Sequence, residues 1–226
     1  MDINYETKPT SYFNGARVDF VNLLPHNPTA KILEIGCGFG VTGALALSEQ
    51  RCGEYIGIEI SDKAAAEAEK MLSKVIKGNV ETLNLQFPDA HFDAAILSEV
   101  LEHLVDPWKL ILRLAPLIRG GGLIMASSPN ISHYRVISML LRGKWNLANS
   151  GVMDRTHLRW FTPDSFKQMF EAAGFQIISL GQVAPITWKS KFANALTLNL
   201  FKHLFVVQIK LVAQKIETTS AQVKIE

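Results

Sequence analysis

The sequence predicts an α/β fold: a doubly wound, Rossmann-like sheet of mostly parallel strands with helices on both faces. Short apolar runs of strand length recur between residues 31 and 127, segments of helical composition separate them, and a glycine-rich loop follows the first run. Strands that alternate with helices form βαβ units and a parallel sheet. A chain of 226 residues can bury a sizeable core without metals or disulfides, so we expect one domain over residues 1–226.

The first five strands and the helices between them follow from local patterns. A helix over Lys63–Ser73 is rich in Ala, Glu and Lys and is capped by Ser61 or Asp62. A second helix spans Leu101–Leu117, with Asp106-Pro107 opening its main part and Gly120–Gly122 ending it. The expected strands are Lys31–Ile35, Tyr55–Glu59, Lys74–Lys77, Phe92–Leu97 and Gly122–Ser127.

The remaining segments are predicted as follows. Residues 1–30 form a helical cover with a helix at Gly15–Leu24, and residues 129–162, polar and dotted with aromatics, form an insertion on the substrate side. Thr162-Pro163 begins a helix over Phe166–Ala173 that Gly174 caps. Strands follow at Phe175–Leu180 and, in competition with a helix, at Phe205–Gln214, while Trp188–Asn199 is a helix or a loop.

Composition excludes several classes of protein. The longest apolar stretches fall far short of the roughly 20 residues of a membrane span, and the N-terminus lacks a secretory signal, so we expect no membrane span. Two cysteines, Cys37 and Cys52, make no disulfide framework and fit a cytoplasmic protein. A net charge of +2 does not favour nucleic acid as a partner, and the sequence does not determine the oligomeric state.

The glycine loop Gly36-Cys37-Gly38-Phe39-Gly40 directly follows the first strand. In an open parallel sheet this position binds ligands, because glycines let the backbone approach them and the next helix offers free N–H groups. In the dinucleotide-binding pattern the third glycine stands three residues after the second, but this chain has Val41 at that position. A frame that starts at Gly38 does fit that pattern but is separated from the strand, so an NAD-dependent oxidoreductase is the alternative that this loop leaves open.

With Glu34, the run Leu-Glu-Ile-Gly-Cys-Gly-Phe-Gly resembles motif I of the class I S-adenosylmethionine-dependent methyltransferases. Further matches to this family follow in order along the chain. Ile56–Glu59 resembles its second strand, which ends in a ribose-binding acid, and Gly78–Glu81 resembles its adenine-binding loop, with Asn79 in place of Asp. Phe92–His103 resembles its fourth strand and the loop that follows. The resemblance implies a seven-stranded sheet and S-adenosylmethionine as cofactor. The implied cofactor-binding residues are Glu34, Gly36, Cys37, Gly38, Gly40, Glu59, Ile60, Asn79, Val80, Ser98, Glu99 and Val100.

A cluster of two carboxylates and a histidine lies beside the expected methyl-donor pocket. In a helix Glu99, Glu102 and His103 would share one face. A similar cluster occurs in ubiquinone-biosynthesis O-methyltransferases and in small-RNA 2′-O-methyltransferases, where it binds a divalent ion, and His157 would be a fourth ligand. Without a metal, Glu99 contacts the cofactor, Glu102 is solvated or ion-paired, and His103 lines the pocket. We expect His103, and after it His157, as catalytic base.

Residues 131–160 carry a local excess of positive charge, which suggests that the small or glycan-type acceptor is anionic. The same residues include several aromatic side chains, which suggests a cover that excludes water from the pocket. A similar pattern, Ser128-Pro-Asn-Ile followed by Met153-Asp-Arg-Thr-His-Leu-Arg, occurs in bacterial methyltransferases associated with glycan synthesis. RNA is the main alternative acceptor. The other interpretations are that these cations form a solvated basic face, or that the chain is a regulatory module that binds the cofactor. The cations are Arg135, Arg142, Lys144, Arg155 and Arg159.

Overall fold

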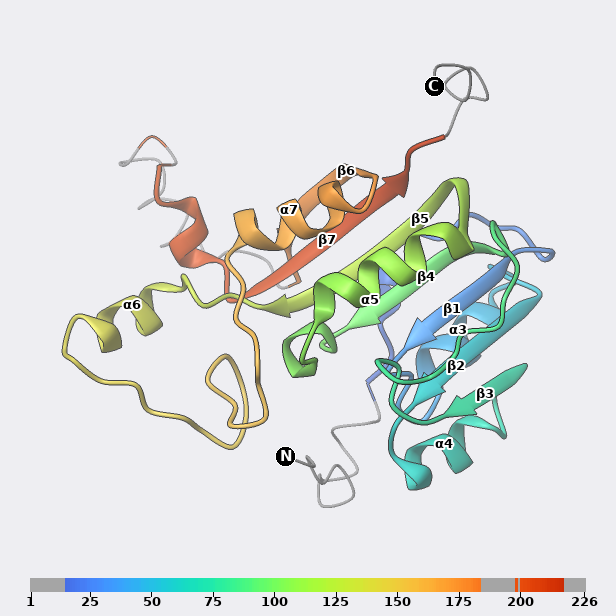
Figure 1. The fold of residues 1–226 in the computed structure, drawn as a ribbon, viewed down its shortest axis with the longest axis horizontal. Helices are drawn as coiled ribbons and strands as arrows, with labels where there is room; N and C mark the ends of the chain where they lie inside the picture. Colours follow the sequence, from blue (N-terminus) through green and yellow to red (C-terminus); the bar gives the residue numbers. More distant parts are fainter. Residues whose placement is uncertain (1–14, 184–197, 199, 218–226) are drawn as a thin grey trace.

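The computed structural model describes residues 15–183, 198 and 200–217. One seven-stranded sheet runs through these residues in the order β3-β2-β1-β4-β5-β7-β6 (Figure 1). The first five strands are parallel, and β7 runs antiparallel between β5 and β6. The predicted doubly wound, mostly parallel sheet of seven strands is therefore confirmed. The order differs from the 3-2-1-4-5-6 order of a dinucleotide fold, because an antiparallel strand is inserted next to β5.

Every predicted strand is present, with small shifts at the ends. The central strand β1 is buried at four of its five residues, because helices cover both faces of the sheet there, and its sequence is accordingly almost continuously apolar. The last strand, which competed with a helix in the sequence, is a strand. The strands are β1 (Lys31–Ile35), β2 (Glu54–Glu59), β3 (Lys74–Lys77), β4 (Phe92–Ser98), β5 (Ile118–Pro129), β6 (Phe175–Gln182) and β7 (Gln208–Lys215).

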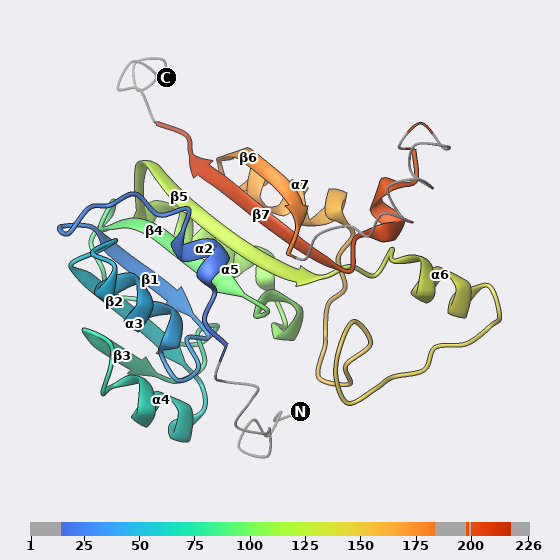
Figure 2. The ribbon, with the colours of Figure 1, turned by 180° about the vertical axis from the view of Figure 1, so that it is seen from behind.

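Helices form a layer on each face of the sheet. Figure 2 shows α2 (Val18–Val21), α3 (Val41–Ser48) and α4 (Asp62–Ala68) in front of the sheet, with α5 (Pro107–Leu114) and α7 (Pro163–Ala172) behind it. Each layer closes its own hydrophobic core. The core under α2 to α4 includes Phe20, Tyr55 and Leu72, and the core under α5 and α7 includes Leu110, Phe166 and Phe170.

The structure corrects the predicted helix over Leu101–Leu117. A 3-10 turn, η2 (Leu101–His103), ends in an extended residue, α5 then begins at Pro107, and a second 3-10 turn, η3 (Ala115–Leu117), follows it. The break has a local cause, because Pro107 has no N–H to continue a helix and the Asp106 side chain caps the new one by accepting from the Lys109 N–H. η2 therefore stands apart from α5, at the end of β4.

The expected glycine turn is also wrong. Gly120–Gly122 lies inside β5, where the register against β4 shifts between Phe92 and Ala94 and Gly121 has φ +73°. The extra residues form an irregularity that a β-strand can absorb when it contains glycines. β5 accordingly starts four residues earlier than the predicted strand.

Other element bounds differ as well. The predicted helix Lys63–Ser73 ends at Ala68, and its cap is Ser61, one of the two expected residues. The predicted helix Gly15–Leu24 is reduced to α2. α7 begins earlier than expected, directly after its cap Thr162. The segment Trp188–Asn199 lies outside the described residues except for Leu198. Among the described helices none is long and apolar enough to cross a membrane.

One helix lies away from the sheet. α6 (Tyr134–Leu140) and the chain that follows it project beyond the carboxyl end of β5, and the short η4 (Lys202–Phe205) lies near α6 in both views (Figures 1 and 2). The rings of Tyr134 and Phe205 lie 6.2 Å apart and connect the two. The predicted insertion, residues 129–162, thus contains one helix, and the chain then returns to the sheet before α7.

Candidate active site

A cavity of about 800 Å³ opens at the carboxyl ends of β1, β2, β3 and β4. Its volume is in the range of small-molecule sites, and its place in the sheet is the one at which open α/β folds bind ligands. Of the twelve residues that the resemblance implied for cofactor binding, eleven line the cavity, and Gly40 does not. Gly40 instead precedes α3 as its N-cap with φ +80°.

The glycine loop lies against the chain that follows β4. Gly36 has φ +70°, and a Cβ atom there would lie 2.6 Å from Cγ2 of Val100. Its N–H donates to the carbonyl of Ile58 at 2.8 Å. Only glycine satisfies both the left-handed conformation and the close approach, so the cavity floor depends on this residue.

Glu59 connects the loop to the end of β2. Its Oε2 accepts from the Gly38 N–H at 2.8 Å, and its Oε1 accepts from the N–H groups of Ile60 and Ser61 at 2.9 Å each. The carboxylate is only 5% exposed, yet it lines the cavity. Three N–H groups thus fix a buried acid at the place where the resemblance puts a ribose-binding group.

The neighbouring acid Glu34 has a raised pKa. Burial raises the pKa of Glu34 to about 8, which hydrogen bonds from Tyr55 and Thr42 oppose and the nearby charge of Glu59 reinforces. The Tyr55 hydroxyl donates to Oε2 of Glu34 at 2.9 Å. Glu34 therefore carries a proton at neutral pH, and the cavity wall holds a neutral carboxyl group there.

Two further predicted residues have mainly local contacts. The Cys37 side chain packs on Gly57, and burial raises the pKa of its thiol, so Cys37 is a packing residue rather than a nucleophile. Asn79 lines the cavity, but its Oδ1 accepts from the Glu81 N–H at 2.9 Å and shapes the turn after β3.

Arg17, just before α2, lines the cavity although no sequence pattern pointed to it. Its guanidinium lines the cavity and donates to the hydroxyls of Ser98 and Ser127, at the ends of β4 and β5. Asp19 accepts from Nε of Arg17 at 2.8 Å and holds the group in place. An arginine at sequence distance 81 from its serine partner matches no short motif, so only the fold reveals it.

Glu99 sits at a strained position beside Arg17. It has φ +55°, and its Oε1 accepts from the Ser127 hydroxyl at 2.8 Å. Burial raises the pKa of Glu99, which the Gln208 and Ser127 hydrogen bonds and the charge of Arg17 oppose. A non-glycine residue in this conformation is held there by its surroundings, as is common at functional sites.

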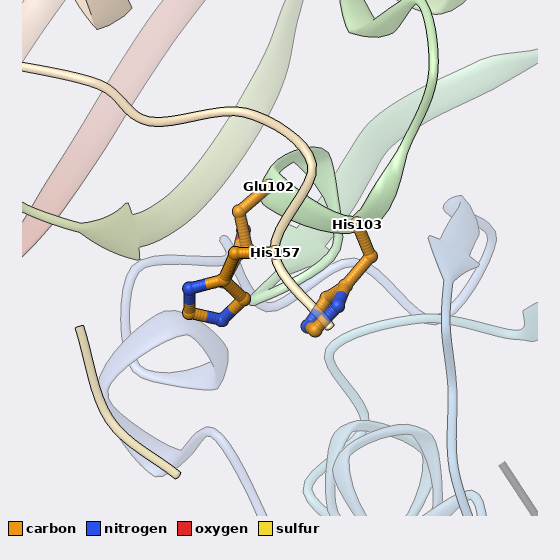
Figure 3. Close-up of side chains that lie close together, drawn as sticks. All are labelled: Glu102, His103 and His157. Carbon is orange, nitrogen blue, oxygen red and sulfur yellow. The ribbon is translucent and has the colours of Figure 1, made fainter. Parts of the chain in front are cut away.

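Glu102, His103 and His157 lie close together (Figure 3), and all three line the cavity. One potential ligand atom of each lies within 4.8 Å of the others, and the two rings are 4.8 Å apart. Glu99 does not belong to this group, so the expected four-residue set is reduced to three. The alternative in which Glu102 is solvated is wrong, because Glu102 is only 1% exposed.

Only one of the two carboxyl oxygens of the buried Glu102 side chain has a hydrogen-bond partner among the described residues. The Ser128 hydroxyl donates to its Oε2 at 3.1 Å, but the buried Oε1 has no hydrogen-bond partner among the described residues. Burial raises the pKa of Glu102, and the charges of Glu99 and Asp154 add to this effect. A buried carboxyl oxygen without a partner is costly, so this atom fits either a proton or a cation from outside the chain.

Backbone carbonyls fix both imidazole rings. Nδ1 of His103 lies 3.2 Å from the Thr156 carbonyl, and Nδ1 of His157 lies 3.1 Å from the Val152 carbonyl. A carbonyl oxygen only accepts, so each Nδ1 bears the hydrogen and Nε2 of the neutral ring has the lone pair. Both rings therefore have the tautomer that a base or a metal ligand acting through Nε2 requires.

The insertion returns to the site to deliver His157. The Leu158 and Arg159 N–H groups donate to the Glu102 carbonyl at 2.7 and 3.0 Å, which attaches the returning chain to η2. A turn closed between Ala148 and Asp154 precedes it, and Oδ1 of Asp154 accepts from the backbone and hydroxyl of Thr156. These bonds place a histidine 54 positions away in the sequence next to His103.

The cations of the insertion are not part of the cavity. Within residues 131–160, the cavity is lined by Asn149–Gly151, Asp154, His157 and Leu158, and none of the five lysine and arginine side chains takes part. Arg159 donates to the Val105 and Leu158 carbonyls and has a structural role. The positive charge that suggested an anionic acceptor therefore lies outside the pocket.

Comparison with known proteins identifies the class of this site. A family model described as a methyltransferase domain matches residues 11–180. The chain is 26% identical over 208 residues to a ubiquinone biosynthesis O-methyltransferase of Aeromonas salmonicida, an alignment that covers 88% of this chain and 86% of that protein.

Solved structures share the fold. A methyltransferase structure from Mesorhizobium loti superimposes with a TM-score of 0.62 at 16% identity, covering 89% of this chain and 99% of that one. One from Archaeoglobus fulgidus superimposes with a TM-score of 0.62 at 21% identity, covering 91% and 97%. At these identities the likeness concerns the fold, whereas the family match concerns the class of enzyme.

Proposed function

Because the chain belongs to the methyltransferase-domain family and is an S-adenosylmethionine-dependent methyltransferase, we propose that it methylates an oxygen atom of a small or glycan-type acceptor. Family membership removes the oxidoreductase alternative. The observation that carries the proposal is the group Glu102, His103 and His157 in the lining of the cavity. A hydroxyl acceptor must lose a proton, and this group offers the lone pairs to take it.

The proposed reaction is an in-line displacement. The acceptor oxygen attacks the methyl carbon, an O–C bond forms while the S–C bond breaks, and the sulfonium leaves as the neutral thioether of S-adenosylhomocysteine. The acceptor proton passes to Nε2 of His103, the more accessible of the two rings, while His157 orients the hydroxyl. Alignment of the two reacting atoms supplies much of the acceleration in such a displacement.

The cofactor is proposed to lie along the carboxyl ends of β1, β2 and β4. The glycine loop would face its methionine part, Glu59 its ribose, and Asn79 with Ile60 its adenine. Arg17 adds a role that the sequence did not suggest. A guanidinium that already donates to two serine hydroxyls is suited to hold the methionine carboxylate of the cofactor.

A divalent cation at the same three side chains is the alternative to proton transfer to His103, because an Nε2 atom that held the ion could not also take the proton. The buried Oε1 of Glu102 lacks a partner among the described residues, and one potential ligand atom each of Glu102, His103 and His157 lies within 4.8 Å of the others. One carboxylate and two imidazoles suit Zn²⁺, Fe²⁺ or Mn²⁺. When bound, such an ion would lower the pKa of an acceptor hydroxyl. Ser128, which donates to Glu102, would orient that ligand.

The test is transfer of labelled methyl from S-adenosylmethionine into host extract that is fractionated into small molecules, lipids, glycans, RNA and protein. We expect label in the small-molecule or glycan fraction, and its loss in Glu102→Gln and His103→Asn. His26→Asn, an exposed histidine outside the cavity, is the control. Label confined to RNA or protein would refute the proposed acceptor, and full activity of Glu102→Gln with indifference to chelator would refute the metal.

A further inference from the structure

The segment from Tyr134 to Leu147 is an exposed, apolar and cationic surface that the methyl-transfer site does not use. Residues 141–150 are all exposed. Four of its large apolar side chains are between 42% and 84% exposed: Leu140, Leu141, Trp145 and Leu147. We call residues 134–147 the protruding segment. Apolar side chains gathered in this way on a projection are unusual on a soluble domain and indicate a contact surface.

The positive charge of this segment is not balanced nearby in sequence. Arg135, Arg142 and Lys144 alternate with the apolar residues, and the chain contains no aspartate or glutamate from Pro107 to Met153. All three cations are exposed, and none lines the cavity. Apolar side chains interleaved with lysine and arginine are the composition of segments that bind the surface of a negatively charged bilayer.

The tip of the segment is structured. The Gly143 N–H donates to the Leu140 carbonyl, the Lys144 N–H to the Met139 carbonyl, and the Asn146 N–H to Sδ of Met139. The Trp145 ring packs edge-on against Trp160 at 5.3 Å, which attaches the tip to the returning chain. The exposed leucines are therefore presented on a preformed turn, so little conformational entropy is lost when they are buried.

The protruding segment continues directly into the wall of the cavity. Asn149 and Ser150, two and three residues after Leu147, line the cavity, and the turn between Ala148 and Asp154 connects them. Figure 1 places α6 and this turn on the side of the sheet where the strands end. A surface that touches the protruding segment is thus close to the mouth of the active site.

We propose that the protruding segment docks the enzyme on an anionic lipid surface, with Leu141 and its neighbours inserted between headgroups and Arg142 and Lys144 paired with lipid phosphates. The docking brings the cavity to acceptors at the membrane surface. It does not depend on the proposed acceptor or on a metal. Charge complementarity favours lipid over a second copy of this chain, since two copies would bring like charges together.

The test is sedimentation of the full chain with vesicles of phosphatidylcholine alone or mixed with phosphatidylglycerol. We expect binding to the mixed vesicles that added salt weakens. Because each cation near such a surface contributes a factor of about five in affinity, Arg142→Gln with Lys144→Gln weakens binding by roughly 25-fold. Leu141→Ser weakens it by about tenfold.

The matched controls lie on α5, which exposes Leu112 and Lys109 near the acid Asp106. Leu112→Ser and Lys109→Gln should leave vesicle binding unchanged, and all variants should keep the unfolding temperature and the affinity for S-adenosylhomocysteine. Equal binding to neutral vesicles, an equal loss in the α5 controls, or no binding at all would overturn the proposal. The proposal would also be overturned if the chain did not bind vesicles but instead self-associated or bound single-stranded RNA, and the same substitutions abolished that binding.

Discussion

Glu59 illustrates how one side chain both builds the site and faces its ligand. Its two oxygens accept from Gly38, Ile60 and Ser61, so the glycine loop and the end of β2 keep their spacing without ligand. A carboxylate that N–H groups hold in this way is preorganised, and binding has to order less of the site. The cost of removing it therefore includes both a ligand contact and the shape of the loop.

We predict that Glu59→Ala weakens binding of S-adenosylhomocysteine by about 1.5–3 kcal/mol, the range for hydrogen bonds to a charged group. Calorimetric titration measures this difference. The matched control is Glu54→Ala at the opposite end of β2, where the carboxylate is partly exposed and pairs with Lys31. Equal affinity of the two variants would show that Glu59 does not face the cofactor.

The buried carboxyl of Glu34 makes stability depend on pH. Its pKa is raised from 4.5 to about 8 in the folded chain, so the folded state binds one proton more than the unfolded state between these values. This contribution to stability is complete below pH 4.5 and is lost as the pH rises towards 8. The slope reaches at most about 1.4 kcal/mol per pH unit.

Glu34→Gln should therefore flatten the decline of the unfolding temperature of the cofactor-free protein between about pH 5 and pH 8. The raised pKa of Glu102 acts in the same direction, so part of the slope remains. Thermal unfolding across this pH range measures the effect, with Glu54→Gln as the partly exposed control. An unchanged slope in Glu34→Gln would mean that Glu34 titrates normally in the folded state.

At the scale of elements, the site depends on two irregular segments rather than on helices. η2 carries Glu102 and His103, and the returning chain of the insertion carries His157. Backbone hydrogen bonds from Leu158 and Arg159 to the Glu102 carbonyl join the two. Since each imidazole is oriented by a carbonyl of the insertion, a displacement of this segment would turn both rings at once.

Asp154→Ala tests this dependence. Without the carboxylate, the turn that leads to His157 loses its bonds to Thr156, and we expect the rate of methyl transfer to fall by up to about a hundredfold, as for a misplacement of about 1 Å. Affinity for S-adenosylhomocysteine should be retained. Asp164→Ala, at the exposed start of α7, is the control, and a full rate in Asp154→Ala would separate the turn from catalysis.

At the scale of the whole molecule, the cavity joins loops that follow four strands of the sheet. The cavity is lined from the ends of β1, β2, β3 and β4, so a bound cofactor stabilises only the folded chain. At a hundred times its dissociation constant, S-adenosylhomocysteine should add about 2.7 kcal/mol. For a chain of this size that is a rise of roughly 5–10 °C in unfolding temperature. Scanning fluorimetry measures it, and a rise with NADH in its place would contradict the assigned cofactor.

The sequence by itself determined the sheet and most of the loop residues that line the cavity at its carboxyl ends. Strand runs and the glycine loop are local patterns, because burial on both faces demands continuous apolar residues and a tight turn demands glycine. The strands after the insertion follow this pattern less closely, because β6 is mostly exposed and the run that forms β7 also fitted a helix. The capping of α5 by Asp106 and of α4 by Ser61 likewise depends on neighbours in sequence, and both were predicted.

Only the tertiary structure decided which residues far apart in the chain meet at the cavity. Arg17 meets Ser98 and Ser127, and His157 meets His103, through contacts between segments far apart in the chain, which no local periodicity encodes. It also separated Glu99 from the group Glu102, His103 and His157, and it placed the insertion's cations outside the cavity. The physical reason is that the sequence specifies the chemical type of each side chain, whereas the packing of the sheet and its loops sets the distance between two side chains.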